Sequence, residues 1–236
     1  MNPQRTPKGT SPVSASPAAL LEDRFEQPGE TYYGGWVLRN VALDCRGLVV
    51  SSKTGIILSR AYFNRPTPTV ARSLVGKYLI RSIDGREVVG KIIEVEAYVG
   101  SGDKACHASK GRTPRTDVIF GPPGISYVYL IYGIYHCLNV VTDREEFPAA
   151  VLIRAVEIDG KLIDGPGRLC RALEIDRSLN RLDMTSGENL WFEDRGGNVP
   201  RGSIGVFPRI GVDYAGEWAK KPWRFRLRAS SGTKTR

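Results

Sequence analysis

A short pattern of acidic and aromatic residues is the first feature that could carry chemistry. Residues 88–99 (VVGKIIEVEAYV) alternate in polarity with the two-residue period of a strand. One face of this strand would be apolar, with Ile93, Val95, Ala97 and Val99. The other face carries Glu94, Glu96 and Tyr98, so a carboxylate could hold a water beside a ring that stacks a flat substrate. The alternatives are a solvated sheet face or a carboxyl pair as in glycoside hydrolysis.

A basic loop is expected directly after this strand, over residues 104–120. No acidic residue lies between Lys104 and Arg115, and His107 lies among the basic side chains. These basic residues are Lys104, Lys110, Arg112 and Arg115. Such a loop could contact the phosphates of a nucleic acid, and an ordinary exposed basic loop is the alternative. A single histidine in such a place is more often structural than catalytic.

A β-hairpin is predicted next, with strands over residues 126–132 and 135–142. Its link, YGIY at 132–135, places Gly133 at the first central position, as a type II′ turn requires. The hairpin is rich in aromatic side chains, namely Tyr127, Tyr129, Tyr132 and Tyr135, with His136 beside them. Tyrosine forms strands readily, so a packed sheet face would explain this composition. The same tyrosines could instead wedge between base steps and stack around an extruded base.

The run from Trp218 to Arg236 combines basic and aromatic residues and contains no acid. Its basic residues are Lys220, Lys221, Arg224, Arg226, Arg228, Lys234 and Arg236, and Trp223 lies among them. This pattern suits a surface that follows a nucleic-acid backbone. A basic strand edge followed by a frayed tail is the alternative.

Several common catalytic signatures are absent from the sequence. There is no Walker A motif, GxGxxG, HExxH or GxSxG, which argues against nucleotide hydrolysis, dinucleotide redox chemistry, zinc proteolysis and serine-hydrolase chemistry. The pairs Cys106–His107 and His136–Cys137 resemble metal ligands, but adjacent residues rarely coordinate one ion together. We therefore expect neither a metal nor a cofactor.

The bulk properties favour a globular protein with a polyanionic partner. The chain has 236 residues and a formal net charge of +9, which would suit a nucleic acid or an anionic membrane surface. No stretch approaches the roughly 20 apolar residues of a membrane span, and residues 1–17 lack the apolar core of a signal peptide. Nucleic acid is thus the preferred partner. We expect an intracellular protein with reduced thiols, in a bacterial cytoplasm (nucleoid) or a nucleus.

The element pattern predicts an α+β fold in one compact domain with a mostly antiparallel sheet. A short helix running into a strand is expected over residues 70–79 and a further helix over 168–174. Additional strands are expected at 149–156, 190–193 and 223–227. We divide the chain into an N-terminal extension (1–57), a catalytic domain (58–228) and a basic tail (229–236). The extension is expected to be largely disordered, although 36–38 and 48–50 could be short strands.

At these residues the sequence resembles the alkyladenine DNA glycosylase family, also called methylpurine or 3-methyladenine DNA glycosylases. The resembling stretches are EVEAYVG (94–100), HASKGRTPR (107–115), FGPPGISYVYLIYGIYHCLNVV (120–141), VLIRAVE (151–157), GPGRLCRAL (165–173) and PRIGVDYAGEWAKKPWRF (208–225). Each alone is weak, but all of them in this order are highly specific. The resemblance implies a curved sheet with flanking helices and a protruding hairpin that inserts into DNA.

The implied activity is base excision repair of double-stranded DNA by a DNA-3-methyladenine glycosylase of type II. The enzyme would flip out and hydrolyse off alkylated or deaminated purines of the 3-methyladenine, 7-methylguanine, hypoxanthine and ethenoadenine class. The product would be an abasic site. A monofunctional enzyme is implied, because no lysine occupies the matched pocket positions and strand cleavage would need an activated amine. We expect a monomer with no membrane partner.

The resemblance also implies roles for single residues. Glu96 would activate the attacking water, and Arg154 would help to hold that water or the nearby backbone. The base pocket would consist of Tyr98, His107, Tyr129 and Asn139, the last of which would exclude a normal guanine. Tyr132 would fill the gap left by the flipped nucleotide, and the DNA-facing hairpin would be completed by Tyr127, Ile134 and Tyr135. The contacts to the DNA backbone would come from Arg112, Arg115, Lys220 and Lys221.

Two other classes of function remain open at this point. A catalytically silent protein that binds bent or damaged DNA could keep the hairpin without the chemistry, although Glu96, Tyr98 and Arg154 are all present. An RNA-binding module could also use the tyrosines, and it would prefer single strands and ignore base damage.

Overall fold

The computed structural model describes residues 31–33, 36–38, 41–43, 49–51, 55–197, 199–200 and 202–228. The chain forms two compact units, Met1–Lys53 and Thr54–Arg236. The first contains two antiparallel strand pairs, β1 (Thr31–Tyr33) with β2 (Trp36–Leu38) and β3 (Val41–Leu43) with β4 (Val49–Ser51). Strands are therefore found near both places where the sequence suggested them. Most of the extension that was predicted to be largely disordered (1–57), including all of residues 1–30, lies outside the described residues, as does the tail at 229–236.

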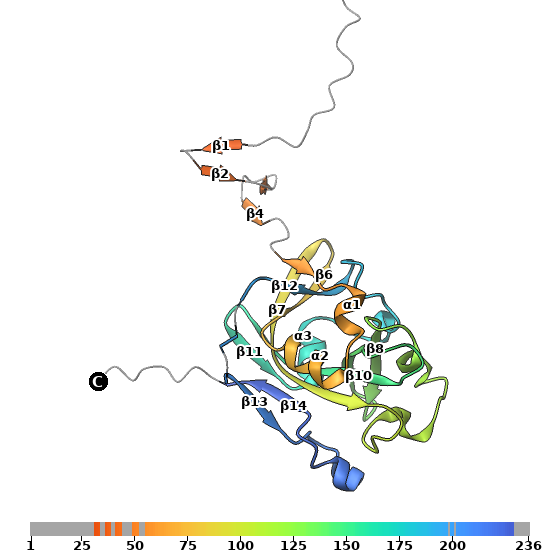
Figure 1. The fold of residues 1–236 in the computed structure, drawn as a ribbon. Coiled ribbons are helices and arrows are strands. Elements are labelled where there is room, and N and C mark those ends of the chain that lie inside the picture. Colours follow the sequence, from red (N-terminus) through yellow and green to blue (C-terminus); the bar gives the residue numbers. More distant parts are fainter. Residues whose placement is uncertain are drawn as a thin grey trace, which may run out of the picture. The chain divides into compact units, whose positions relative to one another are not determined.

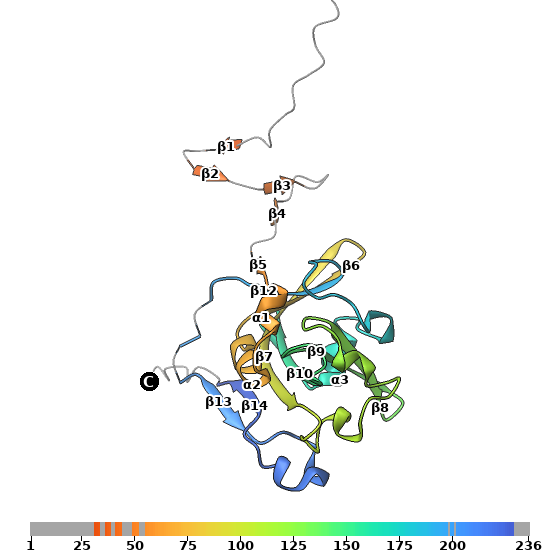
Figure 2. The ribbon, with the colours of Figure 1, turned by 45° about the vertical axis from the view of Figure 1, so that its right-hand side comes forward.

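The second unit is built on a curved antiparallel sheet of ten strands, which Figures 1 and 2 show from two sides. Neighbouring strands follow the order β5-β12-β6-β7-β10-β9-β8, while β11 pairs with β10, and β14 pairs with both β13 and β7. The strands are β5 (Ile56–Ile57), β6 (Tyr78–Ile83), β7 (Arg86–Val99), β8 (Ser126–Ile131), β9 (Tyr135–Val141), β10 (Ala149–Ile158), β11 (Lys161–Asp164), β12 (Leu190–Asp194), β13 (Ile204–Phe207) and β14 (Arg224–Leu227). The predicted α+β class is thereby confirmed.

Short helices pack on this sheet. They are α1 (Arg60–Phe63), α2 (Thr67–Leu74) and α3 (Pro166–Ala172), with 3₁₀ helices η1 (His107–Lys110), η2 (Asp117–Phe120), η3 (Arg177–Leu179) and η4 (Asp213–Trp218). Helix α2 buries positions i, i+3, i+4 and i+7 against β7 and β10, namely Thr67, Val70, Ala71 and Leu74. Pro166 begins α3, which suits a residue without a backbone N–H. No helix in the described part of the chain is long and apolar enough to cross a membrane.

Strand β7 pairs with three other strands of the sheet. Its first half pairs with β6 and its second half with β14, while β10 pairs along its other edge. The register between β7 and β10 shifts between Ile153 and Val156. This irregularity places Ile92, rather than the predicted Ile93, with Val95 and Ala97 in the main hydrophobic core. Beyond the shift, Glu94, Glu96 and Tyr98 share the face opposite that core, as the alternation predicts.

Strands β8 and β9 form a hairpin at the predicted residues, and Ile131 pairs with Tyr135 at its end. The N–H of Ile134 donates to the carbonyl of Ile131 at 3.2 Å. The two residues within this turn, Tyr132 and Gly133, have φ angles of +53° and +69°. Two positive φ angles are typical of a type I′ turn, so the predicted type II′ turn, centred one residue later, is wrong. The difference places Tyr132 at the tip of the turn.

Candidate active site

A cavity of about 230 Å³ lies beside the second half of β7. Strands β8, β9 and β10, helix η1 and the segment 210–214 contribute its walls. The sequence-predicted residues that line it are Tyr98, His107, Tyr127, Tyr129, Tyr132, Asn139 and Arg154. Residues from four separate stretches of the chain therefore converge on one pocket, as their proposed roles in base recognition require.

Glu96 lies directly behind the wall of this cavity, with no solvent-exposed surface. Its Oε2 accepts a hydrogen bond from the Tyr98 hydroxyl at 2.9 Å, and its Oε1 accepts one from the N–H of Ile210 at 2.9 Å. Arg154 Nη1 lies 3.5 Å from Oε1. Tyr98, Arg154 and Ile210 all line the cavity. The solvated-face alternative for Glu96 is thus wrong, because Tyr98, Arg154 and Ile210 enclose its carboxylate.

Burial raises the pKa of the Glu96 carboxyl, while the Arg154 charge and the hydrogen bonds from Ile210 and Tyr98 lower it. The net direction is upward, because removal from water penalises the charged form more than these contacts favour it. A carboxyl with a raised pKa is a better proton acceptor than an ordinary one. The environment of Glu96 therefore suits a general base.

Glu94, the second acid on this face, is surrounded by arginines. Its carboxylate accepts hydrogen bonds from Arg224 Nη1 at 2.9 Å and from Arg226 Nη1, and Arg154 Nε lies 3.4 Å away. The Coulomb attraction of these cations holds Glu94 in a structural role, so a catalytic carboxyl pair is not supported. The expectation that Arg224 and Arg226 belong to a basic outer surface is also wrong, since both turn inward to Glu94.

Three further aromatic rings, those of His107, Tyr127 and Tyr129, line the cavity and contact one another. The His107 and Tyr129 rings meet edge-on with centroids 4.6 Å apart, and those of Tyr127 and Tyr129 are 5.2 Å apart. His107 Nδ1 lies 2.9 Å from the Tyr127 hydroxyl. Tyr127 is only 2% exposed, so its predicted place on the DNA-facing surface of the hairpin is wrong. It supports His107 inside the pocket instead. Asn139 is also buried and donates to the Tyr127 carbonyl at 3.1 Å.

Comparison with known proteins decides the family. The model of the methylpurine-DNA glycosylase family matches residues 61–231. The chain belongs to the methylpurine-DNA glycosylase family. The resemblance inferred from the sequence is confirmed, and the protein is a DNA repair glycosylase for alkylated bases.

Bacterial and archaeal relatives agree with this assignment over most of the glycosylase. A Methanocella arvoryzae protein is 50% identical over 185 residues, which cover 72% of this chain and 91% of the relative. A Myxococcus xanthus protein is 49% identical over 178 residues, covering 73% and 91%. A Legionella pneumophila (strain Corby) protein is 48% identical over 175 residues, covering 72% and 94%. All three are provisionally named 3-methyladenine DNA glycosylases.

The tip of the glycosylase hairpin presents large apolar side chains to solvent. Tyr132 is 85% exposed, Ile134 68% and Tyr135 40%. Tyr132 also lines the cavity, so it stands at the rim. The β9 side of this tip packs against α3, where a Cβ added at Gly167 would lie 2.9 Å from the Tyr135 Cβ. Exposed aromatics of this kind suit contact with a partner surface.

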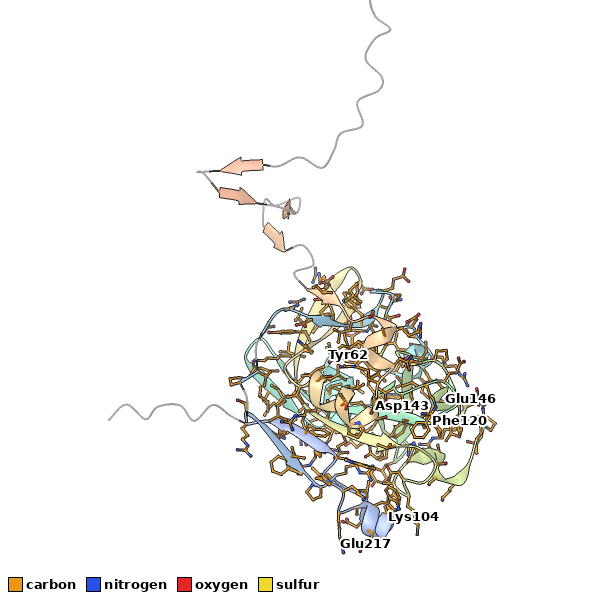
Figure 3. All side chains as sticks on the ribbon, viewed as in Figure 1. Tyr62, Lys104, Phe120, Asp143, Glu146 and Glu217 are labelled. Atoms are coloured by element: carbon orange, nitrogen blue, oxygen red, sulfur yellow. The ribbon has the colours of Figure 1, made fainter. Side chains whose placement is uncertain are left out.

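The candidate DNA-backbone residues differ in whether their charges are paired with acidic side chains. Arg112 forms ion pairs with Asp117 at 2.7 Å and Glu146 at 2.9 Å, near Phe120 in Figure 3. Its charge is thus largely balanced by Asp117, at the end of the loop, and by Glu146, beyond it. Arg115 is exposed and lies over the Tyr129 ring at 5.2 Å. Lys220 pairs with Glu217 at 2.7 Å on the surface, and Lys221 lies over the Trp218 ring at 5.5 Å.

Sequence reasoning assigned no role to the segment 208–214, although it closes one side of the cavity. Ile210, Gly211, Val212 and Tyr214 line the pocket, and Arg209 lies buried behind it. Val212 and Ala215 pack against Ala105. Figure 3 accordingly shows Lys104 and Glu217 at the same end of the molecule. The sequence feature that could have indicated this segment is the PRIGVDYAGEW stretch (208–218). Its residue pattern, however, does not indicate which part of the sheet it would contact.

The described residues contain no group of three or more His, Cys, Asp and Glu side chains that could hold a metal ion.

We expect His107 to be neutral when the glycosylase works. Burial, and to a lesser extent the Arg115 charge, lower the pKa of its imidazole from 6.5 to about 4. The chain has two histidines, so His136→Gln leaves one ring signal to follow by NMR. The His107 resonance should titrate near pH 4 rather than 6.5. Because the folded state prefers the neutral ring, this group should cost stability as pH falls from 6.5 towards 4. Titration at 6.5 or above would contradict the buried stacking position.

Proposed function

We propose that this enzyme hydrolytically excises alkylated and deaminated purines from double-stranded DNA, leaving an abasic site. The substrates are of the 3-methyladenine, 7-methylguanine, hypoxanthine and ethenoadenine class. The observation that carries the proposal is the aromatic cavity with buried Glu96 behind its wall and exposed Tyr132 at its rim. A base within a duplex cannot reach such a pocket, so it must be extruded.

In this proposal the extruded base stacks between Tyr98 on one side and His107 with Tyr129 on the other. Asn139 would crowd the exocyclic amine of a normal guanine. Tyr132 would fill the space that the nucleotide leaves, and Ile134 and Tyr135 would contact the neighbouring bases. Arg115, Lys220 and Lys221 would contact phosphates, whereas Arg112 would have to exchange its acidic partners to do so.

The chemical step follows from the environment of Glu96. Its carboxylate would accept a proton from a water that attacks the sugar C1′, and the N-glycosidic bond would break through an oxocarbenium-like state. Glu96 Oε2 accepts one hydrogen bond among the described residues, from Tyr98, and a carboxylate oxygen can accept two. Arg154 would orient the water or the carboxylate. N3- and N7-alkylated purines already carry positive charge and leave readily, whereas hypoxanthine needs a proton.

We further propose that the enzyme is monofunctional and acts as a monomer. Strand cleavage by a glycosylase needs an amine that forms a Schiff base with the sugar. No lysine occurs among the described residues that line the cavity. The lining residues of one copy already form the cavity, so in this proposal a single copy binds the extruded base.

Product analysis tests this function. A methylated DNA duplex is incubated with the protein, and the supernatant is separated by chromatography. We expect free methylated purines in the supernatant and an intact strand that breaks only after hot alkali. Strand cleavage together with a borohydride-trapped covalent adduct would refute the monofunctional assignment. The absence of any free purine would refute the proposed excision itself.

A further inference from the structure

Arg209 is a buried cation directly behind the cavity. Its side chain has no exposed surface, and its guanidinium forms a two-pronged ion pair with Asp103, with Nη1 2.5 Å from Oδ2 and Nη2 2.9 Å from Oδ1. The same nitrogens donate to the carbonyls of Ala97 and Trp218, each at 3.0 Å. The planar guanidinium therefore connects β7, the loop after it and the segment before β14.

The guanidinium also contacts one wall of the base pocket. It lies over the Tyr98 ring at 4.8 Å and over the Trp223 ring at 5.1 Å. One face of Tyr98 is thus occupied by Arg209, while Tyr98 still lines the cavity. The ring can present only its remaining face to a bound base. Stacking requires that this face be held at a fixed angle.

The neighbours of Arg209 connect it to the chemistry as well. The next residue, Ile210, donates its N–H to Glu96 Oε1 at 2.9 Å. Asp103 also accepts hydrogen bonds from the N–H groups of Val99 at 3.1 Å and Ala105 at 3.0 Å. These two bonds fix the start of the loop that carries His107. Tyr98, the start of the loop that carries His107 and the N–H that binds Glu96 therefore all lie next to the Arg209–Asp103 pair.

We propose that Arg209 is a positioning residue that favours excision of neutral purine lesions over cationic ones. The inference rests on the proposed function. Neutral bases are poor leaving groups, so their release depends most on a well-stacked base and a well-placed carboxylate. A cation behind Tyr98 also weakens the attraction of the ring for a positively charged base on its other face. Better placement of the base and weaker attraction for a cationic base both raise the excision rate of neutral lesions relative to that of cationic ones.

Two variants weaken this arrangement in different ways. Arg209→Lys keeps the charge but removes the planar fork, which a lysine cannot replace. Asp103→Asn keeps the shape but removes the negative partner. A matched control is Arg195→Lys, because Arg195 also pairs with a carboxylate (Glu193, 2.8 Å) and lies over an aromatic ring (Tyr78, 5.2 Å), but does not line the cavity.

The readout is the single-turnover rate on a duplex carrying hypoxanthine divided by the rate on a duplex carrying 7-methylguanine. This ratio does not change with the fraction of folded enzyme, so a merely structural defect leaves it unaltered. We expect it to fall about tenfold in Arg209→Lys and Asp103→Asn, because both variants lose the two-pronged, charge-assisted hydrogen bonds that hold Tyr98 and the Ile210 N–H in place. We expect the parent ratio in Arg195→Lys.

An unchanged ratio in the folded Arg209 and Asp103 variants would overturn the proposal, even if both rates fell together. If Arg209→Lys yields no folded protein, the ratio of the two rates in Asp103→Asn tests the proposal instead. A parent enzyme that releases neither base would instead refute the proposed function, so the two failures are distinguishable.

Discussion

Glu96→Gln should lower the single-turnover rate of purine release by about 10²- to 10⁴-fold, the usual contribution of a general base. The amide is nearly the same size as the carboxylate but cannot accept the proton of the attacking water. Its Oε1 can still accept the hydrogen bond from Ile210 N–H, and its Nε2 can donate to the Tyr98 oxygen where the carboxylate accepted from the hydroxyl, so the pocket should keep its shape. The lesion duplex should therefore bind with an affinity close to that of the parent.

The parent rate should also depend on pH through this carboxyl. The charged form is the active one, and burial raises its pKa from the ordinary 4.5. The rate should consequently be lost on acidification at a higher pH than an ordinary glutamate would give. A matched control is Glu87→Gln, an exposed glutamate on the same strand, which should leave rate and pH profile unchanged. A Glu96→Gln enzyme as fast as the parent would show that another group is the base.

Tyr132→Ala should slow release from duplex DNA by about 10- to 100-fold, corresponding to the 1–3 kcal/mol typical of one base–aromatic stacking contact. Tyr132 is 85% exposed at the tip of the hairpin, so its removal leaves no cavity in the core. Without the ring, nothing fills the gap in the duplex and the extruded state is less populated. Release from single-stranded DNA should be much less affected, because no gap needs filling there.

Tyr132→Phe is the control for this effect, since it keeps the ring and loses only the hydroxyl. The φ angle of +53° is equally unfavourable for tyrosine, phenylalanine and alanine, so backbone strain should not differ among the three. Rates on duplex and single strand are compared for each variant. An equal loss on both substrates in Tyr132→Ala would mean that Tyr132 acts within the pocket rather than as a wedge.

Local periodicity was sufficient to predict the strand that carries the catalytic candidates. Alternation over residues 88–99 placed Glu96 and Tyr98 on one face, and the structure connects them by a hydrogen bond of 2.9 Å. The hairpin and the antiparallel sheet were predictable for the same reason, because turn residues and two-residue alternation are local signals. The resemblance then assigned the pocket residues, and most of them line one cavity.

Features that depend on distant parts of the chain could not be predicted. The arginines of β14 appeared to be a basic outer surface, yet pairing of β14 with β7 directs Arg224 and Arg226 to Glu94. One of the two carboxylates that pair with Arg112, that of Glu146, lies 34 positions away in the sequence. Tyr127 appeared to face DNA because strand alternation does not reveal which face is covered. Burial and ion pairing at these positions are set by tertiary contacts.

The most direct test of the central claim measures binding and release in the same sample. The parent protein is mixed in excess with a duplex that carries a single hypoxanthine, and bound DNA and free base are followed over time. We predict that lesion binding is followed by release of free hypoxanthine and formation of an abasic site. Tight and selective binding of the lesion without release would contradict the account, because the protein would then be a damage-binding module whose pocket does no chemistry.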